Sequence, residues 1–230
     1  MESHATQSAL YNFIGWADAN RKRLIGLVIA LAVVAAIVAF IIYRGNASEA
    51  AASEALSDLR PIQVSPTSPG IVPAQEYLRL ADANAKTSAG ERALLLAGGA
   101  LFAEGRYPEA FSQFEKFIVE HPDSAQRAEA ALGAAASLDA QGKIAEAITR
   151  YKAVTDRYPG SPSEIQAKFS LARLYEVQNK PDLALKFYEE VQKEDPQGSV
   201  GSFYAKLSMA NLMLKNPGLK TPGISAPPIP

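Results

Sequence analysis

Two patterns of apolar and polar residues divide the chain. From Leu24 to Ile42, 19 consecutive residues carry no charged or strongly polar side chain. From residue 74 to residue 215, apolar residues instead recur at the three-to-four-residue spacing of helices that bury one face, and no stretch alternates with a period of two. The sequence therefore predicts one long apolar helix followed by an all-α domain.

The apolar run predicts a transmembrane helix at residues 24–43. At a helical rise of about 1.5 Å per residue the run covers roughly 28 Å, close to the ~30 Å hydrocarbon thickness of a bilayer. Arg21, Lys22 and Arg23 precede it and only Arg44 follows at once, which places the N-terminus in the cytoplasm by the positive-inside rule. The alternative is a cleaved signal peptide, whose apolar region is shorter. We expect the larger C-terminal part on the far side, which in a bacterium is the periplasm.

The segments around these two patterns have their own compositions. Residues 1–23 form a cytoplasmic segment in which "SALYNFIGWADAN" has one-sided helical spacing, and it either lies along the inner membrane surface or extends the transmembrane helix. Residues 44–60 are rich in alanine and predict a juxtamembrane helix. Residues 61–73 hold four prolines and predict a linker, and residues 216–230 hold five and predict a disordered tail.

One segment of the helical domain is repeated at a spacing of 37 residues. The copies "EAFSQFEKFIVEHPDS", "EAITRYKAVTDRYPGS" and "LALKFYEEVQKEDPQGS" align in one register. Each copy follows a short stretch that permits a turn, so each unit predicts a hairpin of two helices closed by a proline. A small residue lets the second helix approach the first, and an aromatic residue one turn later fills the space beside it. The columns are Ala110, Ala147 and Ala184, then Phe114, Tyr151 and Tyr188, then Pro122, Pro159 and Pro196.

These columns resemble the tetratricopeptide repeat, which is nominally 34 residues long. The resemblance includes a small residue in each first helix, at Gly98, Ala135 and Ala172. Three residues are added between the proline and the next repeat, where Ser124 and Ser161 are favourable N-cap residues, so we expect one extra turn at the start of each first helix. The resemblance implies an α-solenoid over residues 74–215, with three full repeats and half-repeats at both ends, or about eight helices.

The same resemblance implies a concave groove, lined by the first helices, in which partner segments bind. Mixed apolar and charged side chains there suit extended or helical peptide segments. Any one of these residues alone is more typical of an ordinary packing or solvated position, and the row is what indicates the groove. A carboxylate clamp is not expected, because only Arg173 fits its basic and amide positions. The row is Arg92, Leu95, Gly99 and Phe102, then Glu129, Leu132, Ala136 and Asp139, then Gln166, Phe169, Arg173 and Glu176.

Composition argues against several other functions. The formal net charge of −1 gives no basic surface for nucleic acid. The chain has no cysteine, which excludes disulfides, thiolate metal sites and thiol nucleophiles. Its two histidines, His4 and His121, are too far apart in the sequence to suggest a metal site. Carboxylate pairs such as Glu189 and Glu190 lie beside lysines, as surface charges do, so we predict no enzyme activity, metal, cofactor or small-molecule substrate.

The order of a cytoplasmic N-terminus, one span and a small repeat domain also resembles the YfgM-like proteins of Gram-negative bacteria. These are described as ancillary partners of the Sec translocon and of periplasmic chaperones. The resemblance implies a single-pass inner-membrane protein whose periplasmic domain binds translocon subunits, chaperones or exported clients. Two alternatives are open. One is a structural scaffold for envelope or cell-division complexes that uses its convex face and Pro-rich tail, and the other is a cytosol-facing receptor with reversed topology.

Overall fold

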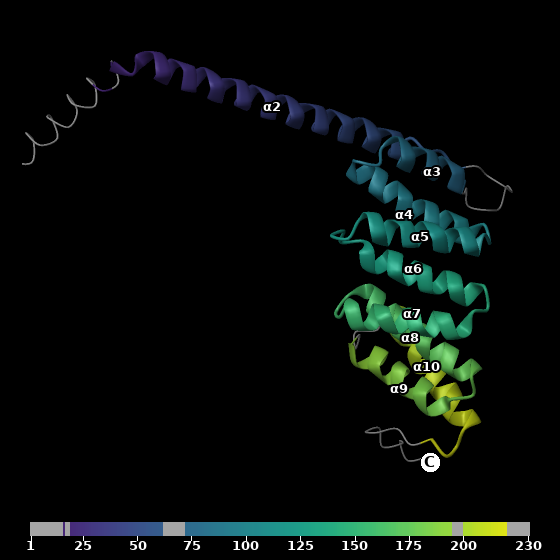
Figure 1. Cartoon of the computed structure of the whole chain (residues 1–230). Coiled ribbons are helices and arrows are strands. Elements are labelled where there is room, and N and C mark those ends of the chain that lie inside the picture. Colours follow the sequence, from purple (N-terminus) through teal and green to yellow (C-terminus); the bar gives the residue numbers. More distant parts are fainter. Residues whose placement is uncertain (1–15, 17–18, 62–71, 195–199, 220–230) are drawn as a thin grey trace, which may run out of the picture. The chain divides into compact units, whose positions relative to one another are not determined.

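The computed structural model describes residues 16, 19–61, 72–194 and 200–219, and this part of the chain contains nine helices and no strand (Figure 1). The predicted all-α class is therefore confirmed. The predictions for residues 1–15, for most of the linker, for Pro196 and for residues 220–230 lie outside the described residues. The chain divides into two units, residues 1–53 and 54–230, which are described in turn.

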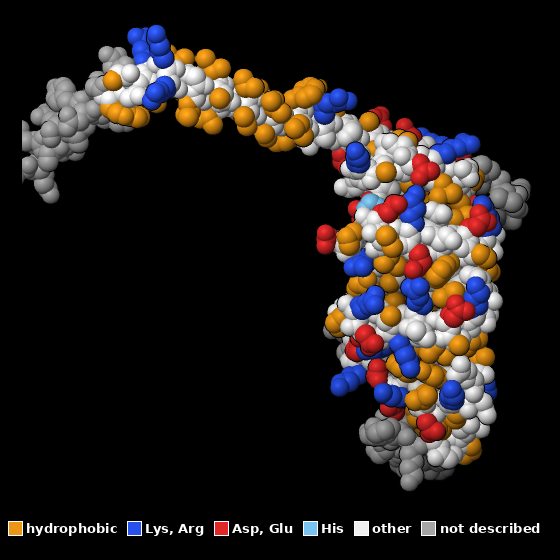
Figure 2. All heavy atoms as spheres, in the orientation of Figure 1, with side chains coloured by type: hydrophobic (Ala, Val, Ile, Leu, Met, Phe, Trp, Pro, Cys, Tyr) orange, Lys and Arg blue, Asp and Glu red, His pale blue; other side chains and the backbone are white. Residues whose placement is uncertain are grey.

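Helix α2 (Arg21–Ser57) is one continuous helix of 37 residues. The predicted span and the predicted juxtamembrane helix are thus parts of a single helix, with no break at Tyr43. Figure 2 shows apolar side chains along α2, with basic side chains near its start. By length and composition α2 is the one described helix that could cross a membrane, and a signal sequence near the N-terminus passes the same test.

The second unit stacks eight described helices, each packed on its neighbours in the chain (Figure 1). Three hairpins, α4–α5, α6–α7 and α8–α9, form the full repeats. Helix α3 is a second helix without its first and α10 is a first helix without its second, as the repeat pattern predicts. The helices are α3 (Ala74–Ala83), α4 (Ser88–Ala103), α5 (Tyr107–Glu120), α6 (Arg127–Ala140), α7 (Ile144–Arg157), α8 (Pro162–Val177), α9 (Pro181–Glu194) and α10 (Val200–Lys215).

A residue with left-handed backbone ends the first helix of each hairpin. These residues are Gly105 with a φ of 76°, Gly142 with 75° and Asn179 with 56°. Glycine and asparagine adopt this conformation at the lowest cost, which explains why they share one column of the repeat. After the first of them, the Arg106 N–H donates to the Leu101 carbonyl at 2.9 Å, and the other two hairpins have the same bond. This C-terminal motif reverses the chain within three residues.

The residues added before the first helices act differently in two repeats. Ser161 caps α8, because its Oγ accepts a hydrogen bond from the Glu164 N–H at 3.1 Å. The same prediction for Ser124 is wrong. Its Oγ accepts from the Gln126 N–H at 3.0 Å within a turn, and α6 begins only at Arg127. The extra turn is therefore present in α8, which has 16 residues, and missing from α6, which has 14.

The repeat columns occupy the interior of the stack. The alanines of the second helices are fully buried, and the aromatic residues one turn later are at most 6% exposed. Burying a side chain of that size stabilises a fold by about 1.5–3 kcal/mol relative to leaving it exposed. Pro122 and Pro159 follow the last residues of α5 and α7 closely, at positions where a helix cannot continue through them. The buried residues are Gly98, Ala110, Phe114, Ala135, Ala147, Tyr151, Ala172, Ala184 and Tyr188.

Candidate functional site

The first helices of successive repeats lie against one another and carry the predicted groove residues. Helices α4, α6, α8 and α10 make contact in that order, although a second helix separates each pair in the chain. All of the predicted groove residues are on α4, α6 and α8. A row that is dispersed over 85 residues of sequence, from 92 to 176, is therefore carried by three neighbouring helices.

A cavity of about 350 Å³ lies among these three helices. It is lined mainly by apolar side chains, as ligand pockets in proteins usually are. Arg92 is exposed on α4 but does not line it. The residues of the predicted row that line the cavity are Leu95, Gly99, Phe102, Glu129, Leu132, Ala136 and Gln166. Residues outside that row complete it, namely Leu96, Phe114, Gly133, Tyr151 and Ser170.

Two glycines make room for the Phe114 ring at this cavity. A Cβ at Gly98 on α4 would lie 2.7 Å from Phe114 Cε1, and a Cβ at Gly133 on α6 would lie 2.5 Å from Phe114 Cζ. Close-packed interiors do not accommodate such distances without a shift. The ring therefore fits between the two helices only because neither residue has a side chain. Gly133 is absent from the predicted groove row, and its signal is the 37-residue column that it shares with Ser170.

Hydroxyl groups distinguish the contact between the second and third repeats from the contact between the first and second. The Tyr151 hydroxyl forms a hydrogen bond with Ser170. Phe114, 37 residues earlier, has no hydroxyl, and Gly133, 37 residues before Ser170, has no side chain with which to bond one. Both members of the bond are therefore missing together where the first and second repeats meet. The groove beside Phe114 and Gly133 is consequently apolar.

The column that contains Asp139 follows the same division. Asp139 forms an ion pair with Arg173. Glu176, 37 residues later, accepts a hydrogen bond from the Tyr188 hydroxyl at 2.5 Å. Phe102 stands 37 residues before Asp139 and contributes a ring to the cavity instead of a carboxylate. The groove thus has an apolar part around Phe114, between the first and second repeats, and a polar part between the second and third repeats.

The tyrosines of the polar part are held neutral. Burial raises the pKa of Tyr151 to about 12, although the bond with Ser170 opposes this shift. Burial also raises the pKa of Tyr188, and the hydrogen bond to Glu176 raises it further. The Phe169 ring packs edge-on against Tyr188, with 5.6 Å between the ring centroids. The predicted groove residues on this side therefore contact other groups of the protein itself.

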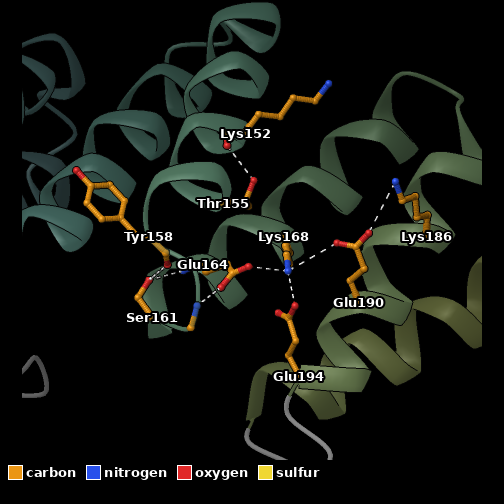
Figure 3. A network of polar contacts seen from close by, with 10 residues as sticks. Lys152, Thr155, Tyr158, Ser161, Glu164, Lys168, Lys186, Glu190 and Glu194 are labelled. Carbon is orange, nitrogen blue, oxygen red and sulfur yellow. Dashed lines mark hydrogen bonds and ion pairs between the residues drawn. The ribbon is translucent and has the colours of Figure 1, made fainter.

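A cluster of charged side chains joins α8 to α9 away from the cavity (Figure 3). Lys168 Nζ lies 2.7 Å from Glu164 Oε1 and 3.7 Å from Glu190 Oε2, and it also pairs with Glu194. Burial alone would raise the pKa of Glu164, but hydrogen bonds from Lys168 and the Gly160 N–H hold that pKa below its usual value. Burial alone would lower the pKa of Lys168, but its bonds to Glu164 and Glu194 raise it. Each of these charges forms an ion pair within the protein, so the cluster holds α8 against α9.

The described residues show no cluster of side chains suited to a metal ion. They include no group of three or more histidine, aspartate or glutamate side chains that could hold a metal ion. His121 Nδ1 lies 3.6 Å from Glu91 Oε2, and its ring packs on Phe117 with 5.1 Å between centroids. His121 therefore joins α4 to the end of α5, which is a packing role.

A stack of helix hairpins with an apolar cavity among its first helices defines a class of protein, the α-solenoid interaction scaffolds. Two family profiles, both of the tetratricopeptide repeat, match residues 92–124 and 132–199. Residues 92–124 and 132–199 are therefore similar to tetratricopeptide repeats. Proteins with this fold are generally non-catalytic and bind other proteins or peptides.

Several solved structures share the fold at low sequence identity. MamA has a TM-score of 0.50 and 19% identity, with 63% of this chain and 77% of that chain covered. A type III secretion (T3SS) complex from Aeromonas hydrophila has a TM-score of 0.50 and 17% identity, covering 60% and 91%. The Rap conjugation gene regulator of plasmid pLS20, in complex with the Phr* peptide, has a TM-score of 0.51 and 16% identity, covering 64% and 42%. The comparison with curated proteins gives no match. At these identities the similarity concerns the fold alone.

Proposed function

We propose that the protein is a membrane-anchored scaffold that binds polypeptide segments of other proteins in the groove formed by α4, α6 and α8. The cavity of about 350 Å³ is the observation that carries this proposal. It combines apolar walls with a position on the first helices of successive repeats. The neighbouring polar part of the groove adds few free groups, because Asp139 and Glu176 are already bonded within the protein.

The walls of the cavity suit a bulky apolar side chain of a bound segment. Leu95, Leu132 and Phe114 provide carbon surface from three helices. Glu129 and Gln166 are exposed at the same cavity, where the carboxylate accepts hydrogen bonds and the amide both donates and accepts them. These two groups fit the backbone N–H and C=O groups that flank an apolar side chain. Burying one such side chain contributes about 1.5–3 kcal/mol, so affinity beyond the millimolar range needs further contacts along the groove.

The anchor in this proposal is α2, with residues 24–43 in the bilayer. The basic residues before the run orient the N-terminal segment, 1–23, toward the cytoplasm and the repeat domain, 74–215, toward the periplasm of a bacterium. Residues 44–60 continue the helix, 61–73 serve as a linker and 216–230 as a tail. The resemblance of this order to YfgM-like proteins supports Sec translocon subunits, periplasmic chaperones or exported clients as partners.

The groove is tested with photo-crosslinking residues placed in the full-length protein in living cells. Phe102, Leu132 and Gln166 are the positions inside the cavity, and Val119, exposed on α5 outside it, is the matched control. We expect polypeptide adducts from the three cavity positions and none above background from Val119. In a Leu132→Gln background, adducts from Phe102 should fall about tenfold, the factor for a loss of 1.4 kcal/mol.

Two results would contradict the groove. The first is equal capture from Val119 and from the cavity, and the second is capture from Phe102 that Leu132→Gln leaves unchanged. Adducts obtained only from residues 216–230 would support the alternative scaffold that uses the tail.

The topology is tested separately by protease accessibility in sealed membrane vesicles. The repeat domain should be protected in inverted inner-membrane vesicles and cleaved in right-side-out spheroplasts. Digestion from the cytoplasmic side would refute the orientation. It would leave the proposed groove unaffected, because the crosslinking result does not depend on the compartment.

A further inference from the structure

A second groove lies between α7 and α9, with α8 as its floor, and it is named the α7–α9 groove. It encloses about 470 Å³ and shares no lining residue with the cavity among α4, α6 and α8. The groove exists because α7 and α9 each pack on α8 but have no Cα atoms within 8 Å of each other. Binding in it would be a second interaction, independent of the proposed function.

The preceding gap, between α5 and α7, shows why the α7–α9 groove is open. There Arg150 Nη1 and Nη2 donate to the two carboxylate oxygens of Glu115 at 2.9 and 3.2 Å, and a cavity of about 40 Å³ remains. Lys152 stands in the column of Glu115, and Phe187 stands in the column of Arg150. A lysine and a phenylalanine cannot form this ion pair, so the gap between α7 and α9 is left open. The groove is thus a feature of these particular residues and not of every repeat.

One end of the α7–α9 groove is basic and aromatic. The rings of Tyr175 and Phe187 stack there, with 5.7 Å between centroids and 10° between planes. Lys152 Nζ lies 5.9 Å and Lys180 Nζ 6.0 Å from the Tyr175 centroid, and Lys186 Nζ lies 5.8 Å from the Phe187 centroid. Of these three ammonium groups, only that of Lys186 has a carboxylate of the described residues within 4 Å, at 3.8 Å. This end therefore attracts an acidic group.

The other end of the α7–α9 groove is acidic. Figure 3 shows Lys168 on α8 shared by the carboxylates of Glu164, Glu190 and Glu194. Asp156 lines the groove from α7, at the level of residue 193 in the 37-residue register, and it forms no ion pair with a described residue. Four carboxylates thus surround one ammonium group, and their field favours a further cation.

We infer that the α7–α9 groove binds an extended segment of another protein that carries an acidic and a basic side chain three residues apart. The two ends of the groove are about 10 Å apart, because seven residues of α9 separate Phe187 from Glu194 at about 1.5 Å each. In a polyproline-II conformation, residues three positions apart are about 9 Å apart and point to the same side. In a β-strand they would point to opposite faces. A helix about 10 Å across would need about 800 Å³ over this length, more than the groove encloses.

The probe is the synthetic peptide acetyl-PPEPPKPP-amide, whose prolines hold the polyproline-II conformation. Its binding to the full-length chain in nonionic detergent is followed by saturation-transfer NMR. Because each charge contact is partly exposed to water, PPQPPKPP and PPEPPQPP should each bind about two- to fivefold more weakly. The peptide PPEKPPPP, in which the two charges are adjacent, should bind no better than these two. Equal binding of all four peptides, or binding of none, overturns the inference.

Two variants of the chain test the two ends of the groove separately. In Lys152→Gln the preference for PPEPPKPP over PPQPPKPP should shrink, while the preference over PPEPPQPP persists. Asp156→Asn should have the converse effect. A general loss of structure would change both preferences alike, and that result, or no change in either, overturns the inference. Lys86→Gln, the same substitution at an exposed position between α3 and α4, is the matched control and should keep both preferences.

Closing the groove tests where the peptide binds. Lys152→Glu combined with Phe187→Arg rebuilds the ion pair of Glu115 and Arg150, so this variant should keep the native urea midpoint and lose the peptide. Leu132→Gln, in the cavity among α4, α6 and α8, should leave peptide binding unchanged, so the two sites are tested independently. Peptide binding that survives the double substitution, or that Leu132→Gln abolishes, overturns the inference.

Discussion

Gly98 and Gly99 are neighbours on α4, yet replacing each with alanine should change stability in opposite directions. Alanine is favoured over glycine inside a helix by about 0.8–1 kcal/mol, and both substitutions receive this gain. At Gly99 a Cβ meets nothing within 4 Å, so the gain is the whole effect. At Gly98 the Cβ would lie 2.7 Å from Phe114 Cε1 and 2.9 Å from Cδ1 and Cζ, so the ring has to move.

The cost of that movement sets the size of the difference. Inserting an extra methyl group into a packed core typically costs about 1–3 kcal/mol. Combined with the helix gain, Gly98→Ala should lie between neutral and about 2 kcal/mol less stable than the native chain, whereas Gly99→Ala should be about 1 kcal/mol more stable. The two variants should therefore differ by about 1–3 kcal/mol in their free energy of unfolding.

The assay is urea unfolding of the full-length chain in detergent micelles, followed by far-ultraviolet circular dichroism. Phe114→Leu is then combined with Gly98→Ala, because a smaller side chain at 114 should relieve the clash. The loss from Phe114→Leu should be smaller when residue 98 is alanine, and the difference is the coupling energy. Equal stabilisation by Gly98→Ala and Gly99→Ala would refute the reasoning, because it would mean that the ring adapts at no cost.

Four further predictions use the same unfolding assay. Gly142→Ala should cost about 1–2 kcal/mol because alanine disfavours the left-handed φ of 75°; an unchanged urea midpoint would contradict this. Lys168→Met should cost about 3 kcal/mol because it leaves the buried Glu164 carboxylate without its cation. Lys168 and the Gly160 N–H lower the pKa of Glu164 in the folded protein. The Glu164 carboxylate therefore contributes to the free energy of unfolding above its usual pKa of 4.5, and this contribution is lost as pH falls through the folded-state pKa. Glu164→Gln should thus flatten the acid side of the plot of stability against pH. Burial raises the pKa of Tyr151 from 10.0 to about 12. The neutral phenol therefore contributes stability that is fully present below pH 10 and is lost as pH rises through 12. Tyr151→Phe should thus flatten the alkaline side of the plot of stability against pH.

The repeat architecture could be predicted because its determinants recur at a fixed distance along the chain. Gly105 and Gly142 end first helices, and Asn179 does the same with a left-handed φ. Each needs only local backbone geometry, so the residue type reveals the turn. The small and aromatic columns pack within one hairpin, and their spacing follows from helix geometry. The half-repeats were visible for the same reason.

The start of α6 could not be predicted from the residue type alone. Ser124 and Ser161 are both good caps, but Ser161 is followed by Pro162, whose fixed φ favours the first helical position. Ser124 is followed by Ala125 and bonds the amide two residues on, which forms a turn instead. A serine hydroxyl can either cap a helix or close a turn, and the next residue determines which of the two forms.

The cavity was only partly predictable, because its shape depends on contacts between different repeats. The groove row places Leu95 at the surface, but Leu95 is only 6% exposed because it lies in the first core cluster. Gly133 matters through the ring of Phe114, which reaches it from the preceding repeat. The bond between Tyr151 and Ser170 likewise joins consecutive repeats. Aligning the repeats by their columns does not reveal which residues of one repeat contact which residues of the next repeat.

The division of the groove has a consequence for where affinity can arise. In its polar part a ligand has to compete with bonds that already exist, such as Asp139 with Arg173 and Glu176 with Tyr188. Breaking one bond to form another yields little net free energy. In the apolar part, around Phe114, a ligand side chain displaces only water from carbon surface, which is favourable by about 25 cal/mol per Å². Under the proposed function, binding strength should therefore come from the surface around Phe114, between the first two repeats. The bonded groups between the second and third repeats should act mainly by holding the shape of the groove.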